Sequence, residues 1–440
     1  MARLFGTDGI RGRAGVDLTA DLALSVGRAV GAFLEARREA PSIVLGRDTR
    51  LSGQLLEAAL LAGLLSAGTD VLMAGVVPTP AVAFLARDFL ADAGGVISAS
   101  HNPAPDNGIK FFGSDGYKFS EETELQVESL MGAAAPSRMG TATMLGEAED
   151  RYVAHALRSL DDRRLDGIKV VIDCANGAAY RTSPRALAEA GAEVIPINVR
   201  PDGTNINADC GSTHPEALIR AVIDHGADAG LAHDGDADRV IAVDERGEIV
   251  DGDAIMAALA IELKEAERLA GDLVVATEMS NLGFKRALEA RGIKVIETAV
   301  GDRLVLEAMV EHDAVMGGEQ SGHVIFMGYS TTGDGLITGL RLLGRMASTG
   351  RPLSEVAGAF EPYPQVLINV EVADRGALDR ATEVSKAIEV AQARLGKQGR
   401  VLVRASGTEP VVRVMVEAAD SATASSIAEE ISEVVVRELA

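Results

Sequence analysis

Three aspartates at alternate positions, Asp234, Asp236 and Asp238, have the spacing that most directly predicts chemistry in this sequence. In an extended segment, residues two apart point to the same side, so we expect the three carboxylates to converge. Converging carboxylates repel each other unless a hard divalent cation binds them, and we predict a metal site here. An EF-hand begins with the same spacing, but it needs glycine where Arg239 stands, and an apolar run follows instead of a helix. A solvated run of charge is the other interpretation, which the apolar flanks disfavour.

A serine that could act as a nucleophile lies in the segment Ser98-Ala-Ser-His-Asn-Pro103, directly after an apolar run. If it is activated, Ser100 can accept a phosphoryl group that neighbouring backbone amides then hold. We expect it to be exposed in a loop, with Lys110 close enough along the chain to point back at it. An ordinary turn is the alternative, because Ser, Asn and Pro are turn formers. No G-x-S-x-G motif surrounds the serine, which disfavours a hydrolase triad.

Near the end of the chain, two arginines flank a group of hydroxyl and glycine residues. The segment is Arg404-Ala-Ser-Gly-Thr-Glu-Pro-Val-Val-Arg413, in which Ser406, Gly407 and Thr408 supply the hydroxyls and the open backbone. Guanidinium groups, hydroxyls and free amides together bind phosphate, so this segment is a candidate phosphate cradle. A hairpin turn with incidental arginines is the alternative.

Two weaker motifs complete the set of candidates. The segment Gly318-Glu-Gln-Ser-Gly-His323 offers carboxylate and hydroxyl ligands for a sugar and a titratable imidazole, but it reads equally well as a turn. The segment Phe5-Gly-Thr-Asp-Gly-Ile-Arg-Gly12 is likewise a glycine-rich turn that carries one candidate arginine, Arg11.

The elements that must position these motifs form a pattern that occurs three times. Each repeat has an apolar run, a helical stretch and two further apolar runs: 43–45, 54–67, 71–73 and 95–97; 170–172, 184–190, 194–197 and 229–232; 274–276, 284–290, 295–296 and 314–316. A polar, glycine-rich segment follows the third run of each repeat, and a returning strand follows that segment, at 109–112, 240–243 and 324–327. Such alternation predicts parallel β-α-β units, whose ligands bind beyond the carboxyl ends of the strands.

The last part of the chain follows a different pattern. We predict a strand at 366–372, a helix at 377–395, two strands at 401–403 and 411–416, and a final helix. The predicted fold is therefore three similar mixed-sheet α/β domains (1–150, 151–252 and 253–365) and a smaller α+β domain (366–440) around a central cleft. The Ala-, Gly- and Ser-rich stretch 131–146 is the expected connector.

Composition limits the classes of partner. The formal charge is −23, from 42 Lys and Arg against 65 Asp and Glu, which disfavours nucleic acid and anionic membranes. Two cysteines in 440 residues form no disulfide framework. The first residues contain no signal-peptide core, and the most apolar run, 58–67, is too short to span a membrane. We therefore expect a cytoplasmic protein.

Taken in order over essentially the whole chain, these motifs resemble the α-D-phosphohexomutase superfamily. Its members show a Ser-His-Asn-Pro phosphoserine loop, an Asp-Gly-Asp-x-Asp-Arg metal loop, a Gly-Glu-x-Ser-Gly-His sugar loop and an Arg-x-Ser-Gly-Thr phosphate loop. All four are intact here. The N-terminal Phe-Gly-Thr-Asp-Gly-Ile-Arg-Gly and Gln320 look like those of the members that act on glucosamine phosphates.

The resemblance implies a mutase that transfers a phosphoryl group between phosphorylated Ser100 and a sugar through a glucosamine 1,6-bisphosphate, which also serves as activator. It would supply amino-sugar precursor for the cell envelope. One Mg²⁺ per chain would bind Asp234, Asp236, Asp238 and an oxygen of the Ser100 phosphate.

The resemblance also implies roles for the remaining residues. Lys110 and His323 would be general acid/base candidates. Arg11, His101 and Arg239 would stabilise charge in the site. The sugar would bind Glu319, Ser321 and a further loop of Gly301, Asp302 and Arg303. The second phosphate would bind Arg404, Ser406, Gly407, Thr408 and Arg413.

Other functions remain open at this point. The chain could be a phosphoglucomutase or phosphomannomutase of the same superfamily, a metal-dependent phosphomonoesterase that uses Ser100, or a non-catalytic binder of sugar phosphates. We expect a small phosphosugar as the substrate and a monomer or homodimer as the assembly.

Overall fold

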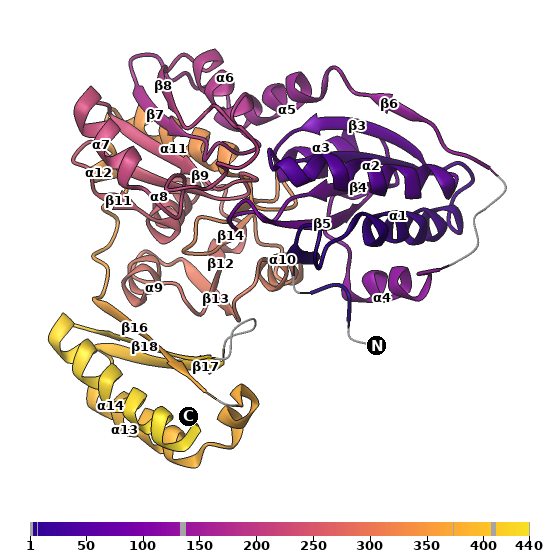
Figure 1. Ribbon diagram of the computed structural model, residues 1–440. Coiled ribbons are helices and arrows are strands. Elements are labelled where there is room, and N and C mark those ends of the chain that lie inside the picture. Colours follow the sequence, from indigo (N-terminus) through magenta and orange to yellow (C-terminus); the bar gives the residue numbers. More distant parts are fainter. Residues whose placement is uncertain (1–2, 7, 133–137, 373, 406–410, 440) are drawn as a thin grey trace. The chain divides into compact units, whose positions relative to one another are not determined.

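The structure is a computed structural model that describes residues 3–6, 8–132, 138–372, 374–405 and 411–439. The chain forms two compact units (Figure 1). The first comprises residues 1–279 and 292–359, and the second comprises residues 280–291 and 360–440.

The first sheet of unit 1 has six strands in the order β1-β5-β4-β2-β3-β6. Its strands are β1 (Ile10–Arg13), β2 (Ser42–Arg47), β3 (Asp70–Val76), β4 (Ala93–Ile97), β5 (Asp106–Gly113) and β6 (Ala142–Met144). The accompanying helices are α1 (Ala20–Glu35), α2 (Leu51–Ser66), α3 (Thr79–Asp88), α4 (Glu121–Ser129) and α5 (Ala148–Leu157).

Helix α1 shows how local sequence fixes these elements. The Thr19 side chain caps the helix by accepting a hydrogen bond from the Leu22 amide at 3.2 Å. Its buried residues, among them Val26, Val30 and Phe33, recur at the spacing of one helix face and join the core of the first sheet.

The second and third sheets repeat part of the first. The second contains β7 (Lys169–Asp173), β8 (Glu193–Ile197), β9 (Ala229–His233), β10 (Val240–Asp244) and β11 (Ile249–Val250). The third contains β12 (Leu273–Thr277), β13 (Lys294–Thr298), β14 (Met316–Gly318) and β15 (Val324–Phe326). The other helices of unit 1 are α6 (Thr182–Glu189), α7 (Glu216–His225), α8 (Gly252–Glu265), α10 (Asp302–Glu311), α11 (Gly335–Thr349) and α12 (Leu353–Val356).

One four-strand arrangement occurs in all three sheets. It reads β3-β2-β4-β5 in the first, β8-β7-β9-β10 in the second and β13-β12-β14-β15 in the third. The first three strands are parallel and the fourth returns antiparallel in each case. The predicted mixed-sheet α/β repeat is confirmed, and each polar motif lies between the third strand and the returning strand.

The structure differs from the predicted elements at three places in unit 1. Residues 142–144 of the expected connector form β6, which pairs with β3 at the sheet edge. Residues 10–13 of the expected N-terminal turn form β1, which pairs antiparallel with β5. The third repeat's strand β14 begins two residues later than predicted. Short edge strands such as β1 form because their backbone hydrogen-bonds to a neighbouring strand. Only one of the four residues of β1 is fully apolar, so its sequence shows no alternation of apolar and polar residues.

Unit 2 is the predicted α+β domain with one addition. Its sheet has the antiparallel order β16-β18-β17, from β16 (Gln365–Glu371), β18 (Val411–Ala418) and β17 (Gly399–Ala405). Helices α13 (Thr382–Leu395) and α14 (Ser421–Leu439) cover one face of it (Figure 1), with Val412, Val414 and Val416 fully buried. The addition is α9 (Leu282–Glu289), which groups with this unit and not with the third repeat. The helix predicted at 377–395 begins only at Thr382, because Ala381 has an extended backbone that separates it from a short 3₁₀ helix.

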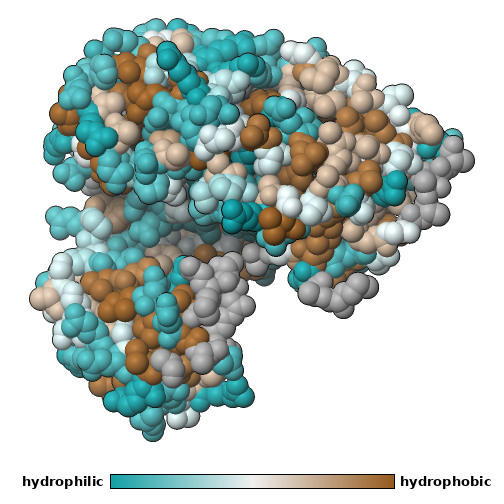
Figure 2. Space-filling view, in the orientation of Figure 1, coloured by the Kyte–Doolittle hydropathy of each residue, from teal (hydrophilic) through white to brown (hydrophobic). Residues whose placement is uncertain are grey.

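The described helices include none that combines the length and the hydrophobicity needed to cross a membrane. Figure 2 shows hydrophilic residues distributed over the visible face, with apolar residues in smaller patches between them.

Candidate active site

Ser100 lies directly after β4 in a strained backbone conformation. Its φ is +50°, in the left-handed region that residues with a side chain seldom adopt. The residue is 1% exposed, so the expectation of an exposed loop serine is wrong. Its Oγ donates a hydrogen bond to Asp234 Oδ2 at 2.6 Å, and its amide donates to Ser98 Oγ at 3.0 Å. Strain of this kind persists where surrounding contacts enforce it, and it is frequent at functional sites.

The contacts that enforce this loop come from Arg50, which sequence reasoning missed. Arg50 is completely buried and donates to the carbonyl oxygens of Ser100 (2.9 Å) and Asn102 (2.8 Å). It donates further to the carbonyl oxygens of Pro103 and Asp106. Its charge is balanced by Asp48, with 2.8 Å between Arg50 Nε and Asp48 Oδ2. One guanidinium thus holds four carbonyls of the loop, which a residue with fewer donors could not do.

The three aspartates form the loop that follows β9, and their carboxylates converge. One oxygen from each of Asp234, Asp236 and Asp238 lies within 4.8 Å of the others, and all three residues are buried. The segment is a turn and not the extended strand that we expected, because Ala237 adopts a φ of +57°. Convergence therefore arises from the turn and not from alternation along a strand.

This metal loop packs directly on the Ser100 loop. A Cβ at Gly235 would lie 2.6 Å from the Ser100 carbonyl oxygen, so only glycine allows this approach. From the second repeat, Asn207 donates to the carbonyl oxygens of Ser100 (2.9 Å) and Asn102 (3.0 Å). The first and second polar loops are therefore one continuous site.

The aspartate cluster has the chemistry of a cation site. Asp236 Oδ1 and Asp238 Oδ1 are buried and make no hydrogen bond to any described residue. Burial, with the repulsion from Asp238 and Asp236, raises the pKa of Asp234 well above its usual range. Unpartnered carboxylate oxygens and mutual repulsion are both relieved by a hard divalent ion, so these residues fit one.

Lys110 lies on β5 beside this cluster. Its Nζ is 3.0 Å from Asp236 Oδ2, 3.9 Å from Asp238 Oδ2 and 3.5 Å from Asp8 Oδ2. Burial alone would lower the pKa of Lys110, but these three carboxylates raise it above its usual value. Lys110 is therefore an ammonium in this arrangement, able to donate to an anion.

His323 approaches the metal loop from the third repeat. Its Nδ1 lies 3.6 Å from Asp238 Oδ2, and its Nε2 accepts the Gly333 amide at 3.0 Å. Burial lowers the pKa of His323, but Asp238 more than offsets this and the pKa is raised. Both ring nitrogens of His323 have partners here. To take part in proton transfer, the imidazole must give up its contact with Asp238 or with the Gly333 amide.

The remaining cations lie around Ser100. Arg239 Nη1 is 3.4 Å from His101 Nδ1, and His101 Nδ1 is 3.4 Å from Ser100 Oγ. Burial, with the positive charges of Arg239 and Arg11, lowers the pKa of His101 to about 4. Arg11 pairs with Asp8 and reaches Asn102 Oδ1 at 3.4 Å. His101 is thus neutral at pH 7, while both arginines carry charge.

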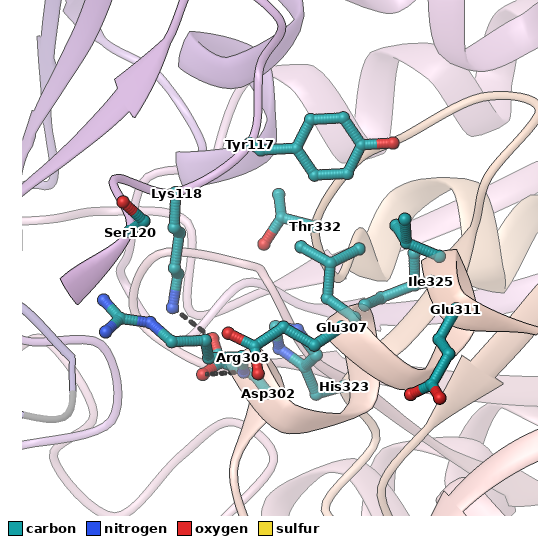
Figure 3. Close-up of a pocket in the computed structure, with 12 residues that line it drawn as sticks. Tyr117, Lys118, Ser120, Asp302, Arg303, Glu307, Glu311, His323, Ile325 and Thr332 are labelled. Atoms are coloured by element: carbon teal, nitrogen blue, oxygen red, sulfur yellow. Dashed lines mark hydrogen bonds and ion pairs between the residues drawn. The ribbon is translucent and has the colours of Figure 1, made fainter. Parts of the chain in front are cut away.

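The sugar-loop residues lie close to each other. Glu319 accepts a hydrogen bond from Ser321 Oγ at 3.1 Å and from the Gly301 amide at 3.2 Å. Asp302 pairs with Lys118, and Arg303 Nη2 lies 2.7 Å from Glu124 Oε1. A cavity of about 350 Å³ adjoins this group, and Lys118, Asp302 and His323 are among its lining residues (Figure 3).

In unit 2, Arg404 on β17 and Arg413 on β18 are direct cross-strand partners. They lie on the face of the sheet opposite to α13 and α14, because Val403, Val412 and Val414 pack on the helix side. Ser406, Gly407 and Thr408 lie outside the described residues.

Comparison with family models identifies four matching domains. Models of phosphoglucomutase/phosphomannomutase match in order: alpha/beta/alpha domain I at residues 2–137, domain II at 150–247, domain III at 251–363 and the C-terminal domain at 367–434.

Curated relatives and solved structures extend over the same length. The chain is 52% identical over 442 residues to a phosphoglucosamine mutase of Desulforamulus reducens, which covers 99% of both chains. It is 53% identical over 449 residues to one of Mycolicibacterium smegmatis, covering 98% and 99%. Among solved structures, a phosphoglucomutase/phosphomannomutase family protein of Burkholderia thailandensis is 27% identical, with a TM-score of 0.84 and coverage of 99% and 97%. An Aspergillus fumigatus N-acetylphosphoglucosamine mutase, solved with GlcNAc-6P and magnesium, shares the fold at 19% identity, with a TM-score of 0.71 and coverage of 99% and 95%.

The role of Arg50 can be tested by its removal. Arg50→Met leaves Asp48 as an uncompensated buried charge and removes one donor from each of four carbonyls, of which those of Ser100 and Asn102 keep Asn207. We expect the free energy of unfolding to fall by about 3–5 kcal/mol. Urea denaturation measures this. Arg38→Met, at an exposed ion pair with Asp92, is the control and should cost less than about 1 kcal/mol. A loss as small as the control's for Arg50→Met would show that other contacts hold the loop.

Proposed function

The chain belongs to the phosphoglucomutase/phosphomannomutase family, and we propose that it catalyses the phosphoglucosamine mutase reaction, which interconverts glucosamine 6-phosphate and glucosamine 1-phosphate. Full-length identity of 52–53% to relatives of that activity supports the substrate. The hydrogen bond between Ser100 and Asp234 carries the mechanism, because it places a candidate nucleophile against a candidate metal ligand.

In the proposed reaction, the resting enzyme carries a phosphoryl group on Ser100. The oxygen on C1 of glucosamine 6-phosphate forms a new bond to that phosphorus while the bond to Ser100 Oγ breaks; the C1 hydroxyl proton passes to a base, and Ser100 Oγ takes a proton. The product is glucosamine 1,6-bisphosphate. After the bisphosphate reverses its orientation, its 6-phosphoryl group returns to Ser100 Oγ, which gives its proton to a base; the C6 oxygen takes a proton, and glucosamine 1-phosphate is released.

The residues around Ser100 have roles that follow from their charge. Phosphoryl transfer needs charge neutralisation and alignment more than covalent help from the protein. Lys110, Arg239 and Arg11 would neutralise the transferred group, and neutral His101 would donate or accept a hydrogen bond. Lys110 and His323 remain the acid/base candidates.

Mg²⁺ is the ion that we propose for the aspartate loop. Asp234, Asp236 and Asp238 would hold it together with an oxygen of the Ser100 phosphate, and when bound it supplies positive charge to the transferred group.

We also propose a division of labour among four domains, at residues 1–150, 151–252, 253–365 and 366–440. They would supply the nucleophile, the metal ligands, the sugar ligands and the ligands of the second phosphate. Glu319, Ser321, Gly301, Asp302 and Arg303 would form the sugar-binding set. Arg404 and Arg413, which are direct cross-strand partners, would supply guanidinium donors to the second phosphate.

The test of the function is a coupled assay on three substrates with Ser100→Ala as the negative variant. We expect kcat/KM to be highest for glucosamine 6-phosphate, lower for glucose 6-phosphate and mannose 6-phosphate, with no release of inorganic phosphate. Intact mass should show phosphate on Ser100. Ser100→Ala should lose at least about a thousandfold in rate, because the covalent step is removed, whereas Ser129→Ala, at the end of α4, should keep it. Release of inorganic phosphate at the turnover rate would indicate an esterase, and full activity of Ser100→Ala would exclude the covalent mechanism.

Metal dependence is a separate prediction. Chelation should stop turnover, and Mg²⁺ should restore it better than Ca²⁺, because the smaller ion suits a tight octahedral site. Asp236→Asn removes an anionic ligand and should weaken both Mg²⁺ affinity, measured by calorimetry, and rate. Asp224→Asn, an exposed aspartate of α7, is the control. Undiminished turnover after chelation would assign the aspartates another function.

The phosphate cradle gives a third prediction. Arg413→Ala removes a charge-assisted contact and should cost about 2–3 kcal/mol, or about 30- to 150-fold in kcat/KM, for both sugar monophosphates. Arg413→Lys should recover only part of this, because an ammonium forms no bidentate fork. Mg²⁺ affinity should not change. Arg394→Ala on α13, which pairs with Glu430, should behave as wild type. Wild-type KM values for both monophosphates in Arg413→Ala would rule the assignment out.

A further inference from the structure

A row of alternating charges runs through unit 1 beyond the residues used above. In order, it contains Asp302, Lys118, Asp8, Lys110 and Asp236. Lys118 Nζ pairs with Asp302 and lies 2.6 Å from Asp8 Oδ1; Lys110 Nζ lies 3.5 Å from Asp8 Oδ2 and 3.0 Å from Asp236 Oδ2. Each lysine thus lies between two carboxylates, and Asp8 lies between the two lysines.

Lys118 and Asp8 are the members of this row that have no place in the proposed chemistry, and Lys118 is the one that reaches Asp302. It follows β5, and its backbone is fixed by an isolated antiparallel bridge to Phe112. Its side chain is 9% exposed, so its charge is largely removed from water. Figure 3 shows it extending from the first repeat towards Asp302 at the start of α10. A buried ammonium is retained only where carboxylates compensate it, and here they come from two separate segments.

Two residues that follow Lys118 along the chain, Phe119 and Glu124, bind Arg303, the neighbour of Asp302. Arg303 Nη2 donates to the Phe119 carbonyl oxygen at 3.0 Å and pairs with Glu124 Oε1 at 2.7 Å. Both residues that open α10 are therefore bound by the segment that follows β5. In this structure Asp302 and Arg303 are engaged by protein partners, which is the arrangement of a loop held in position.

We propose that Lys118 is a positioning residue, whose ammonium sets Asp302 of the substrate loop and, through Asp8, orients Lys110 beside the metal loop. Without it, Asp8 and Asp302 face each other as two carboxylates without the cation between them, and they must separate. That movement displaces the sugar loop on one side and releases Lys110 from one of its acceptors on the other. A displacement of about 1 Å costs up to about a hundredfold in rate. The inference rests on the proposed function, because it concerns the alignment of that reaction.

The experiment compares Lys118→Met, Lys118→Arg, Asp302→Asn and the double variant Lys118→Met/Asp302→Asn with wild type. Measured quantities are kcat and KM for glucosamine 6-phosphate, Mg²⁺ affinity and Tm. We expect Lys118→Met to lower kcat/KM by about 10- to 100-fold, with Mg²⁺ affinity within about threefold of wild type. Lys118→Arg should recover part of the rate because it keeps the charge.

The double variant separates positioning from stability. It removes both members of the ion pair, so no carboxylate is left unpaired at α10 and Tm should return towards wild type. It also remains testable if Lys118→Met alone does not fold. We expect the double variant to be slower than Asp302→Asn alone, because Lys110 has also lost its alignment through Asp8. A double variant with the same kcat/KM as Asp302→Asn alone would overturn the proposal, since Lys118 would then have no effect on alignment beyond its pair with Asp302.

A control variant excludes a general loosening of the same two segments. Thr331→Val removes the hydrogen bond from Thr331 Oγ1 to the Gly116 carbonyl oxygen, 2.5 Å long, which joins the third repeat to the first; Gly116 lies two residues before Lys118, but the bond involves no member of the charged row. Its kcat/KM should be within about twofold of wild type, and a loss equal to that of Lys118→Met would overturn the proposal. Failure of wild type to convert the substrate would instead refute the proposed function.

Discussion

Repulsion among three buried carboxylates is the constraint on which the rest of unit 1 depends. Asp234, Asp236 and Asp238 lie within a few ångströms of each other in a part of the protein that water reaches poorly. Such a cluster is unfavourable unless cations and hydrogen-bond donors surround it. Lys110 supplies charge, Thr79 Oγ1 donates to Asp236 Oδ2 at 2.6 Å, and Ser100 donates to Asp234. The groups that compensate the cluster are also those that a phosphoryl group needs, so stability and chemistry impose the same arrangement.

In the loop that carries Ser100, a buried cation compensates an unfavourable backbone conformation. Arg50 donates to the carbonyl oxygen of Ser100, whose φ of +50° is left-handed. The carbonyl oxygens of this loop accept hydrogen bonds from buried side chains. Arg50 and Asn207 satisfy those oxygens from two different repeats. The proposed nucleophile is thereby fixed before any substrate binds, which would remove the entropic cost of ordering it during the reaction.

The sequence predicted the repeat well, because three sets of apolar runs with the same order require the same strand arrangement. It predicted that Ser100 and the aspartates follow the third strands of their repeats, but not that Ser100 is buried or that a turn at Ala237 brings the aspartates together. It failed for Arg50, Asp8 and Lys118, because most of their partners lie far away along the chain; the pairs of Arg50 with Asp48 and of Asp8 with Arg11 are the local exceptions. The arginine of Asp48-Thr-Arg50, directly after β2, was the available signal. The edge strands β1 and β6 were missed because pairing, and not side-chain alternation, defines them.

The composition of unit 2 has a consequence for the order of folding. Its core assembles from residues 360–440, but α9, at residues 280–291, is part of the same unit. The two pieces are joined by a buried carboxylate: Glu417 is fully buried, accepts the Leu282 amide at 3.1 Å and pairs with Arg400 at 2.5 Å. During synthesis, α9 leaves the ribosome well before β16 and must wait for the C-terminal strands. A fragment that starts at residue 360 would therefore leave the buried Glu417 without the Leu282 amide that donates to it here.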